Sequence, residues 1–246
     1  MKILTWNVLH RIHAENYDDP AVGRWPDEVA RTRHVVALIS GAMRAGTIDV
    51  ALLQELSGDT LAALRSELQN YSVISHVYPR VPRPRRARSA LIAPEEHLVV
   101  VGPTGARRLH SETFGTDPGK GLLAVEVALG VSVATTHVSF GASSQAQLAR
   151  LSQLAQEIPS VCCVGGDFNA PRAVVAQNLS EEFEVAEVAA GPSRTHSPND
   201  DRHGRDLDHL CFRRGTITEV RVLLSSGLSD HRPVWASFQP GARGGD

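Results

Sequence analysis

The chain has 246 residues, a formal net charge of −2 at pH 7 and a pI near 6.6. Hydrophobic residues make up 42% of it, which is enough for a full core and excludes wholesale disorder. The near-neutral charge excludes a global basic field that would draw the protein onto nucleic acid, so a local patch must hold any polyanion.

The cysteines indicate a reducing compartment. Cys162 and Cys163 are neighbours, and neighbours on a strand point to opposite faces, so they would form a poor disulfide. With Cys211 the count is odd, which favours buried thiols. The first residues lack the apolar core of a signal peptide, and no apolar run reaches membrane-spanning length. We therefore expect a soluble, cytoplasmic monomer that does not bind a membrane.

Short strands and helices are predicted along the first third of the chain. Pro26 and the acids after it favour a helix start, and Gly46 ends that helix. His10 and His13 have the spacing of a metal-binding pair, but a solvated loop is the simpler interpretation. The expected elements are a strand 2–6, an irregular segment 8–25, a helix 26–45 with Val29, Val36, Ile39 and Met43 as its apolar stripe, a strand 50–53, a helix 57–68 and a strand 71–77.

An arginine-rich segment follows. Residues 80–88 contain five arginines and two prolines, a composition typical of an extended basic loop. Two interpretations stay open, a solvated surface loop and an arm that grips phosphate beside a site. In the second, Arg85, Arg86 and Arg88 are candidates for substrate binding, together with His196 of the polar loop 191–205.

The rest of the chain is predicted to be rich in strands. Gly130 separates two alternating segments, which predicts a hairpin. No low-complexity linker divides the chain, so we expect one domain over residues 1–240, a β-sandwich flanked by helices, and a disordered tail 241–246. The expected elements are strands 89–93, 97–101, 122–129, 131–138 and 161–164, helices 143–157 and from 171, and strands 183–189, 206–212, 216–224 and 234–238.

The segment 163–171 organises the candidate chemistry. Gly165 and Gly166 are expected to end the strand and to leave room for a ligand near the main chain. Asp167 and Asn169 follow at positions i and i+2, so in an extended segment their side chains share one face. A carboxylate and an amide placed together can take a proton from water while holding a phosphate oxygen or a hard cation. The alternative interpretation is a simple turn.

Polar side chains recur at the ends of the predicted strands. Strand ends at one edge of a sandwich converge, and a divalent cation would offset the repulsion between converging carboxylates. The available ligands are rich in oxygen and contain no cysteine, which favours Mg²⁺ or Mn²⁺ over structural zinc. The set comprises Asn7, Glu55, His137, Asp167, Asn169, Asp208, Asp230 and His231.

Six short motifs carry a family resemblance. They are Thr5-Trp6-Asn7, Leu53-Gln54-Glu55, Thr136-His137, Gly166-Asp167-Phe168-Asn169, Leu207-Asp208-His209 and Ser229-Asp230-His231. In these motifs the chain resembles the endonuclease/exonuclease/phosphatase family, the DNase I-like superfamily. The resemblance implies a four-layer α/β sandwich of two mainly antiparallel sheets flanked by helices. It also implies hydrolysis of a phosphate ester with Mg²⁺ or Mn²⁺.

The resemblance further implies roles for the motif residues. Glu55 would be the principal metal ligand, with Asn7 and Asp230 near the metal. Asp167 would orient or deprotonate the attacking water. His137 and Asn169 would hold phosphate oxygens, and His231, polarised by Asp208, would face the phosphorus. Asp206 and His209 stand where the family often has Arg and Tyr, which puts the substrate contacts in question.

The sequence indicates the substrate less directly than it indicates the fold and the reaction. The arginine segment favours a phosphodiesterase acting on nucleic acid or a nucleotide, and the alternative is a phosphomonoesterase for a small metabolite such as an inositol or sugar phosphate. A third possibility is a binding module without activity, against which the intact set of acids and histidines argues. Only 5% of residues are aromatic, so broad base stacking is not expected.

Overall fold

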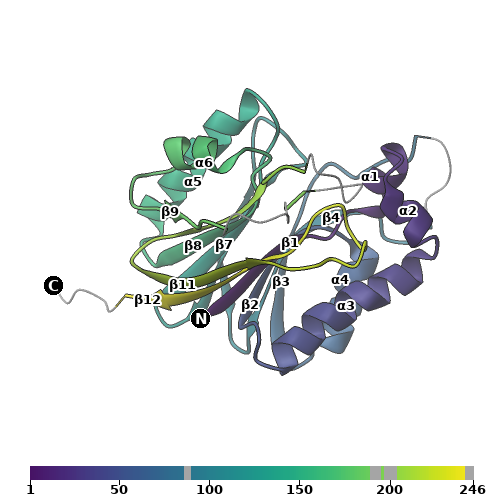
Figure 1. Ribbon diagram of the computed structural model, residues 1–246, viewed down its shortest axis with the longest axis horizontal. Coiled ribbons are helices and arrows are strands. Elements are labelled where there is room, and N and C mark those ends of the chain that lie inside the picture. The colour runs from purple at the N-terminus through teal and green to yellow at the C-terminus, as the bar shows by residue number, and fades with distance from the viewer. Residues whose placement is uncertain (86–89, 189–194, 197–203, 242–246) are drawn as a thin grey trace.

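Two six-stranded β-sheets pack face to face, with helices on their outer faces (Figure 1). The computed structural model describes residues 1–85, 90–188, 195–196 and 204–241. Arg86, Arg88 and residues 242–246 of the expected tail lie outside this part of the chain. The predicted four-layer α/β sandwich is confirmed. None of the described helices is both long and apolar enough to cross a membrane.

Each sheet is mixed, with one parallel pair among antiparallel neighbours. The pairs are β1 with β2 in the first sheet and β7 with β8 in the second. Across the first sheet the order is β11 (Gly215–Val222), β12 (Val234–Pro240), β1 (Lys2–Asn7), β2 (Val50–Ser57), β4 (Glu96–Pro103) and β3 (Tyr71–Val77). Across the second it is β5 (Arg107–Thr113), β6 (Gly121–Ala128), β7 (Val131–His137), β8 (Val161–Asp167), β10 (Asp208–Phe212) and β9 (Glu184–Val185).

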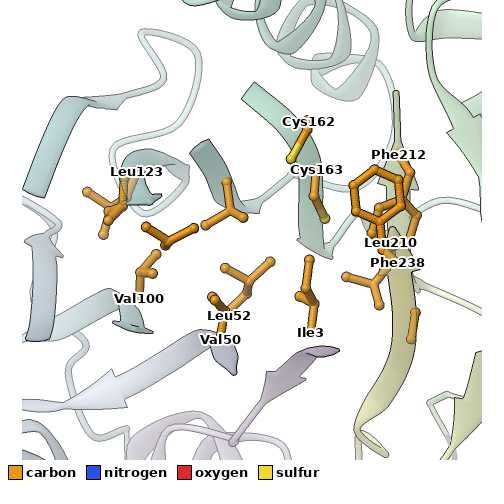
Figure 2. Packing of buried hydrophobic residues seen from close by; sticks show 14 of the residues in the cluster. Ile3, Val50, Leu52, Val100, Leu123, Cys162, Cys163, Leu210, Phe212 and Phe238 are labelled. Carbon is orange, nitrogen blue, oxygen red and sulfur yellow. The ribbon is translucent and has the colours of Figure 1, made fainter. Parts of the chain in front are cut away.

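Three apolar clusters separate the layers. Between the sheets, side chains such as Leu52 and Leu210 pack with Phe212 and Phe238, whose rings stack at 4.5 Å (Figure 2). A second cluster joins the first sheet to α3 (Glu28–Arg44) and α4 (Gly58–Glu67). A third joins the second sheet to α5 (Ser143–Glu157) and α6 (Arg172–Asn178). The three cysteines are free and buried, as predicted, and burial raises the pKa of each thiol.

The segment 8–25 was predicted to be irregular, but it contains two short helices. They are α1 (Arg11–Asn16) and α2 (Pro20–Arg24). The His10 ring accepts a hydrogen bond from the Ile12 N–H, and the Asp19 carboxylate accepts one from the Ala21 N–H. These caps satisfy the first N–H groups of helices too short to show an apolar period.

The predicted stripe of α3 was wrong at one position. Val29 is 59% exposed, whereas Val35 is buried with Val36, Ile39 and Met43. The helix begins at Glu28, where Asp27 caps it by accepting from the Val29 and Ala30 N–H groups, so Val29 lies in the first turn.

The edges of the second sheet also differ from the prediction. β5 was missed because its residues are mostly polar, as suits an exposed edge strand. β9 has two residues rather than the seven predicted. Residues 90–93 form no strand, and residue 89 lies outside the described chain.

Gly165 and Gly166 were predicted to end the strand, but β8 continues through both of them to Asp167. At Gly166 the neighbouring strand β7 is so close that an added Cβ would overlap the Thr136 carbonyl oxygen. Glycine is therefore required here for the close approach of two backbones rather than for a turn.

Gly166→Ala is expected to lower the free energy of unfolding by about 1–3 kcal/mol, because the overlap is with backbone and cannot be relieved by a rotamer change. Urea denaturation measures the change. Gly41→Ala is the matched control, since nothing lies within 4 Å of its added Cβ in α3, and it should stabilise by about 0.5–1 kcal/mol. Equal effects of the two substitutions would contradict the packing argument.

Candidate active site

The carboxyl ends of both parallel pairs lie at one edge of the sandwich. β1 packs on β8 and β2 packs on β7 across the interface between the sheets. In register, His137 pairs with Asp167, and Asp167 pairs with Asp208 of the next strand. The polar residues that follow these apolar strands therefore meet, as the convergence argument expects.

Glu55 lies in an irregularity of β2 rather than at a strand end. The register of β2 against β4 shifts between Leu53 and Leu56, and Glu55 has φ +60°. A left-handed conformation at a residue other than glycine costs about 1–3 kcal/mol, and such positions cluster at functional sites. The bulge turns the Glu55 side chain into the site, where its Oε2 accepts a hydrogen bond from the His10 N–H at 3.0 Å.

Asn7 connects Glu55 to Asp167. Its Nδ2 donates to Glu55 Oε1 at 3.0 Å and to Asp167 Oδ2 at 3.1 Å, while its Oδ1 accepts from the Leu9 N–H at 3.0 Å. In this arrangement the amide nitrogen faces the carboxylates. A metal ligand would present its oxygen, so binding by Asn7 requires the amide to rotate.

Asp167 is buried and remains ionised. Its Oδ1 accepts from the Asn169 N–H at 2.9 Å, and its Oδ2 lies 3.2 Å from His137 Nε2. Burial by itself raises the pKa of the Asp167 carboxyl. The charges of His231, His137 and Lys120 outweigh it, and the pKa lies well below its usual range. Asp167 is thus an anion held in a water-poor site.

Asn169 holds the exit of β7. Its Nδ2 donates to the Val138 carbonyl oxygen at 2.8 Å, and its φ of +48° makes it a second left-handed residue in the site. One of the two N–H groups of the amide is therefore already engaged.

His231 and Asp208 form a buried pair. His231 Nδ1 lies 2.8 Å from Asp208 Oδ2, and its Nε2 lies 3.8 Å from Asp167 Oδ2 and 4.0 Å from Asp230 Oδ1. Burial lowers the pKa of the imidazole, but the carboxylates of Asp208, Asp230 and Asp167 outweigh that effect and raise it well above its usual range. His231 is consequently an imidazolium at neutral pH, and its Nε2 faces the pocket.

The loop that carries His231 is tied to the first strand. Ser229 Oγ donates to the Asn7 carbonyl oxygen at 2.8 Å and accepts from the His231 N–H at 3.0 Å. The buried guanidinium of Arg31 donates to the carbonyl oxygens of Val8, Leu9 and Leu228. Sequence reasoning missed Arg31, because nothing local marks an arginine on a helix as buried.

Three further residues of the site were missed or misjudged. Lys120 Nζ contacts His137 Nε2, and its placement between two glycines was the only signal in the sequence. His13, assigned to a solvated loop, lies 2.9 Å from the buried Glu96 carboxylate, whose Oε1 is 3.8 Å from His137 Nδ1. His10 is also buried, and burial lowers its pKa to about 4.

The site contains one pocket of about 280 Å³, the catalytic pocket. Asn7 and Asp208 do not line it, but they contact Asp167 and His231, which do. Lys120, Arg80, Tyr17 and Phe140 join the predicted residues there. Among the predicted residues in its lining are Glu55, His137, Asp167, Asn169, His196, Asp230 and His231.

The predicted substrate-binding residues divide into three groups. His196 lines the catalytic pocket, with its Nε2 3.3 Å from Asp230 Oδ2. Arg85 lines a neighbouring pocket of about 480 Å³ with Arg80 and Arg83. Arg86 and Arg88 lie outside the described residues.

The donor set fits a hard divalent cation. Glu55, His137 and Asp167 offer ligand atoms that lie within 4.8 Å of one another. Burial raises the pKa of Glu55, but His13, His137 and Lys120 lower it far more, so its carboxylate is ionised. Anionic oxygens without a thiolate suit Mg²⁺ or Mn²⁺.

Comparisons with known proteins agree with this fold. The model of the Endonuclease/Exonuclease/phosphatase family matches residues 4–231. A Bacteroides vulgatus endonuclease/exonuclease/phosphatase has a TM-score of 0.70 at 15% identity, covering 97% of this chain and 98% of its own. Humanized D. rerio TDP2 gives 0.67 at 18% identity, covering 97% and 98%. The human Nocturnin catalytic domain gives 0.65 at 19%, covering 97% and 94%. No curated sequence matches the chain at a significant level.

Proposed function

Because the chain belongs to the endonuclease/exonuclease/phosphatase family, we propose that it is a Mg²⁺- or Mn²⁺-dependent phosphodiesterase acting on nucleic acid or nucleotides. One observation carries the proposal. An ionised, buried Asp167 and a protonated His231 face one catalytic pocket, with their Oδ2 and Nε2 atoms 3.8 Å apart. A base and an acid beside the same small space suit attack of water on a phosphate.

The residues divide the hydrolysis between them. Asp167 takes a proton from the attacking water, whose oxygen forms a bond to phosphorus as the bond to the leaving oxygen breaks. His231 donates a hydrogen bond to a phosphate oxygen, and Asp208 fixes its tautomer and charge. Lys120 adds positive charge where negative charge develops on the phosphate, and His137 holds a phosphate oxygen. The leaving oxygen takes up a proton from solvent and Asp167 returns its proton to solvent, which completes the balance.

A bound Mg²⁺ or Mn²⁺ would neutralise charge on the phosphate. Glu55 would hold it, with Asp230 and a rotated Asn7 nearby. Asn169 keeps the turn after β8 in place and positions Asp167, since its backbone N–H binds the carboxylate. We further propose that residues 1–240 form a single catalytic domain that acts as a monomer.

The D. rerio TDP2 relative is known with single-strand DNA product, and the arginines beside the pocket favour a similar polyanion here. The test is a panel of DNA and RNA oligonucleotides, bis(p-nitrophenyl) phosphate, sugar phosphates and inositol phosphates, with Mg²⁺, Mn²⁺ or EDTA. Metal-dependent cleavage of diesters supports the proposal. Cleavage of monoesters alone would support the phosphomonoesterase, and no activity on any substrate would contradict both.

Removing Arg83 and Arg85 together as alanines should weaken oligonucleotide binding and reduce the slope of log K against log salt by about 1.4–1.8. Both side chains are exposed and line the 480 Å³ pocket next to the catalytic pocket. Fluorescence anisotropy at several salt concentrations measures the slope. Arg107→Ala removes a charge from β5 and serves as the control. An unchanged slope in the double variant would mean that this segment does not hold phosphate.

A further inference from the structure

Two aromatic rings stand exposed beside the catalytic pocket. Tyr17 is 71% exposed and Phe140 is 63% exposed, and no other Phe, Tyr or Trp of the described chain has its side chain in the exposed class. Both line the catalytic pocket. Exposed rings gathered at one site provide surfaces on which a planar, apolar group can stack.

The same two rings line a second, adjoining pocket of about 460 Å³, the aromatic pocket. Leu9, Ala14 and Pro20 complete its apolar lining. The volume lies in the range of pockets that hold compact organic ligands, about 300–1,000 Å³. A nucleobase meets these requirements, because it has an apolar face and a polar edge.

Charge differs sharply between the two sides of the catalytic pocket. Asp18, Asp19 and Asp230 line the aromatic pocket together with His13 and His196, and no lysine or arginine among the described residues does so. On the other side, the 480 Å³ pocket is lined by Arg80, Arg83 and Arg85. A phosphate is attracted on the arginine side and repelled on the aspartate side.

The arginine side is also held in place. Arg80 forms an ion pair with Asp117 at 3.2 Å, and the Arg85 N–H donates to Asn16 Oδ1 at 2.9 Å. The Arg85 guanidinium lies over the Tyr17 ring, 5.2 Å from its centroid. Tyr17 is therefore the junction between the phosphate-attracting side and the aromatic pocket.

We propose that the substrate is single-stranded polynucleotide and that the enzyme removes its terminal nucleotide. The terminal base stacks in the aromatic pocket, the scissile phosphate enters the catalytic pocket, and the remaining phosphates follow the arginines. This inference rests on the proposed phosphodiesterase activity. Each turnover consumes one water, which forms a bond to phosphorus as the bond between the terminal nucleotide and the rest of the strand breaks. A paired base has its faces covered by its neighbours and cannot enter.

The first experiment compares one oligonucleotide in linear, circular and duplex form, as DNA and as RNA, with Mg²⁺ or Mn²⁺. The linear single strand should release mononucleotides from the start of the reaction. The circle, which has no terminal base, should be cut at least about a hundredfold more slowly, and a blunt duplex at least about tenfold more slowly. Equal cleavage of circle and line, or early internal fragments, would overturn the proposal.

The second experiment tests the charge asymmetry. A phosphate added to the terminus that enters the aromatic pocket should slow cleavage about tenfold relative to a hydroxyl. In Asp18→Asn combined with Asp19→Asn, that ratio should fall below about threefold. Both changes suit the backbone, since Asn tolerates the φ of +54° at residue 18 and caps a helix as Asp19 does. The control combines Glu181→Gln with Glu184→Gln, exposed acids away from the site, and should keep the tenfold ratio.

Failure of this inference is distinguishable from failure of the proposed function. Hydrolysis of bis(p-nitrophenyl) phosphate needs the catalytic pocket but no strand terminus. If that compound is hydrolysed while circle and line are cut equally, the proposed phosphodiesterase activity is supported and the proposed binding of a terminal nucleotide is refuted. If neither the compound nor any oligonucleotide is hydrolysed, both fall. An unchanged phosphate ratio in the aspartate double variant would also overturn the assignment of the pocket.

Discussion

Asp167→Asn is expected to lower kcat for diester hydrolysis by about 10³-fold, within the range that a positioned general base contributes. The substitution keeps the size of the side chain, but the asparagine amide is not basic enough to take a proton from water. The substitution also removes the anion 3.2 Å from His137 Nε2, which leaves Glu55 Oε1, at 3.8 Å, as the remaining carboxylate beside that nitrogen. Initial rates at saturating substrate and fixed Mn²⁺ measure the loss.

The matched control for this variant is Asp49→Asn. Asp49 is an exposed acid whose carboxylate accepts from the Lys2 N–H at the opposite end of β1, so its rate should stay within about twofold of the original. Thermal unfolding separates lost chemistry from lost fold. A folded Asp167→Asn protein that retains more than a tenth of the activity would refute Asp167 as the base.

Asp208→Asn is expected to move the alkaline limit of activity to lower pH and to reduce the rate at pH 8 by about 10²-fold. Among the carboxylates that raise the pKa of His231, Asp208 is the largest contributor. Without it, burial draws the pKa of the imidazole back toward or below its ordinary value near 6.5. The active, protonated form then disappears as pH rises through neutrality. At pH 6 the loss should be only about tenfold.

A pH–rate profile from pH 5 to 9 measures this shift, and Asp49→Asn should overlay the original profile. His231 also contributes to the free energy of unfolding. Because the folded pKa of His231 is raised, its contribution is complete below the unfolded pKa and is lost as pH rises through the folded one. An Asp208→Asn profile that is lower at every pH by the same factor would show that Asp208 does not set the charge of His231.

Most of the fold could be predicted from local patterns in the sequence. Apolar runs ended by polar or glycine residues predicted the strands at 2–6, 71–77 and 131–138, and α5 has the predicted bounds. The errors lie in segments where burial produces no periodic pattern of apolar residues. α1 and α2 are too short for a stripe, and β5 is a polar edge strand. Gly166 was misjudged because its close approach to β7 is a property of the pair of strands and not of one strand.

The site shows the same division. Its motif residues were predicted together because each was expected at or near a strand end. The structure brings six of the eight into one pocket and places Asn7 and Asp208 in contact with members of those six. Lys120 and His13 enter the pocket from segments whose own sequence indicates only loop. Tyr17 and Phe140 could not be identified from a low aromatic content, because their exposure depends on neighbours distant in the sequence.

The position of β1 also determines when the enzyme becomes active during synthesis. β1 is made first, yet it lies between β2 and β12, and β12 is made last. The contact of Ser229 with Asn7 spans 222 residues, and closing so long a loop comes late in folding. A nascent chain on the ribosome therefore lacks both its completed sheet and His231. Such a chain completes its catalytic pocket only after its last strand has been made.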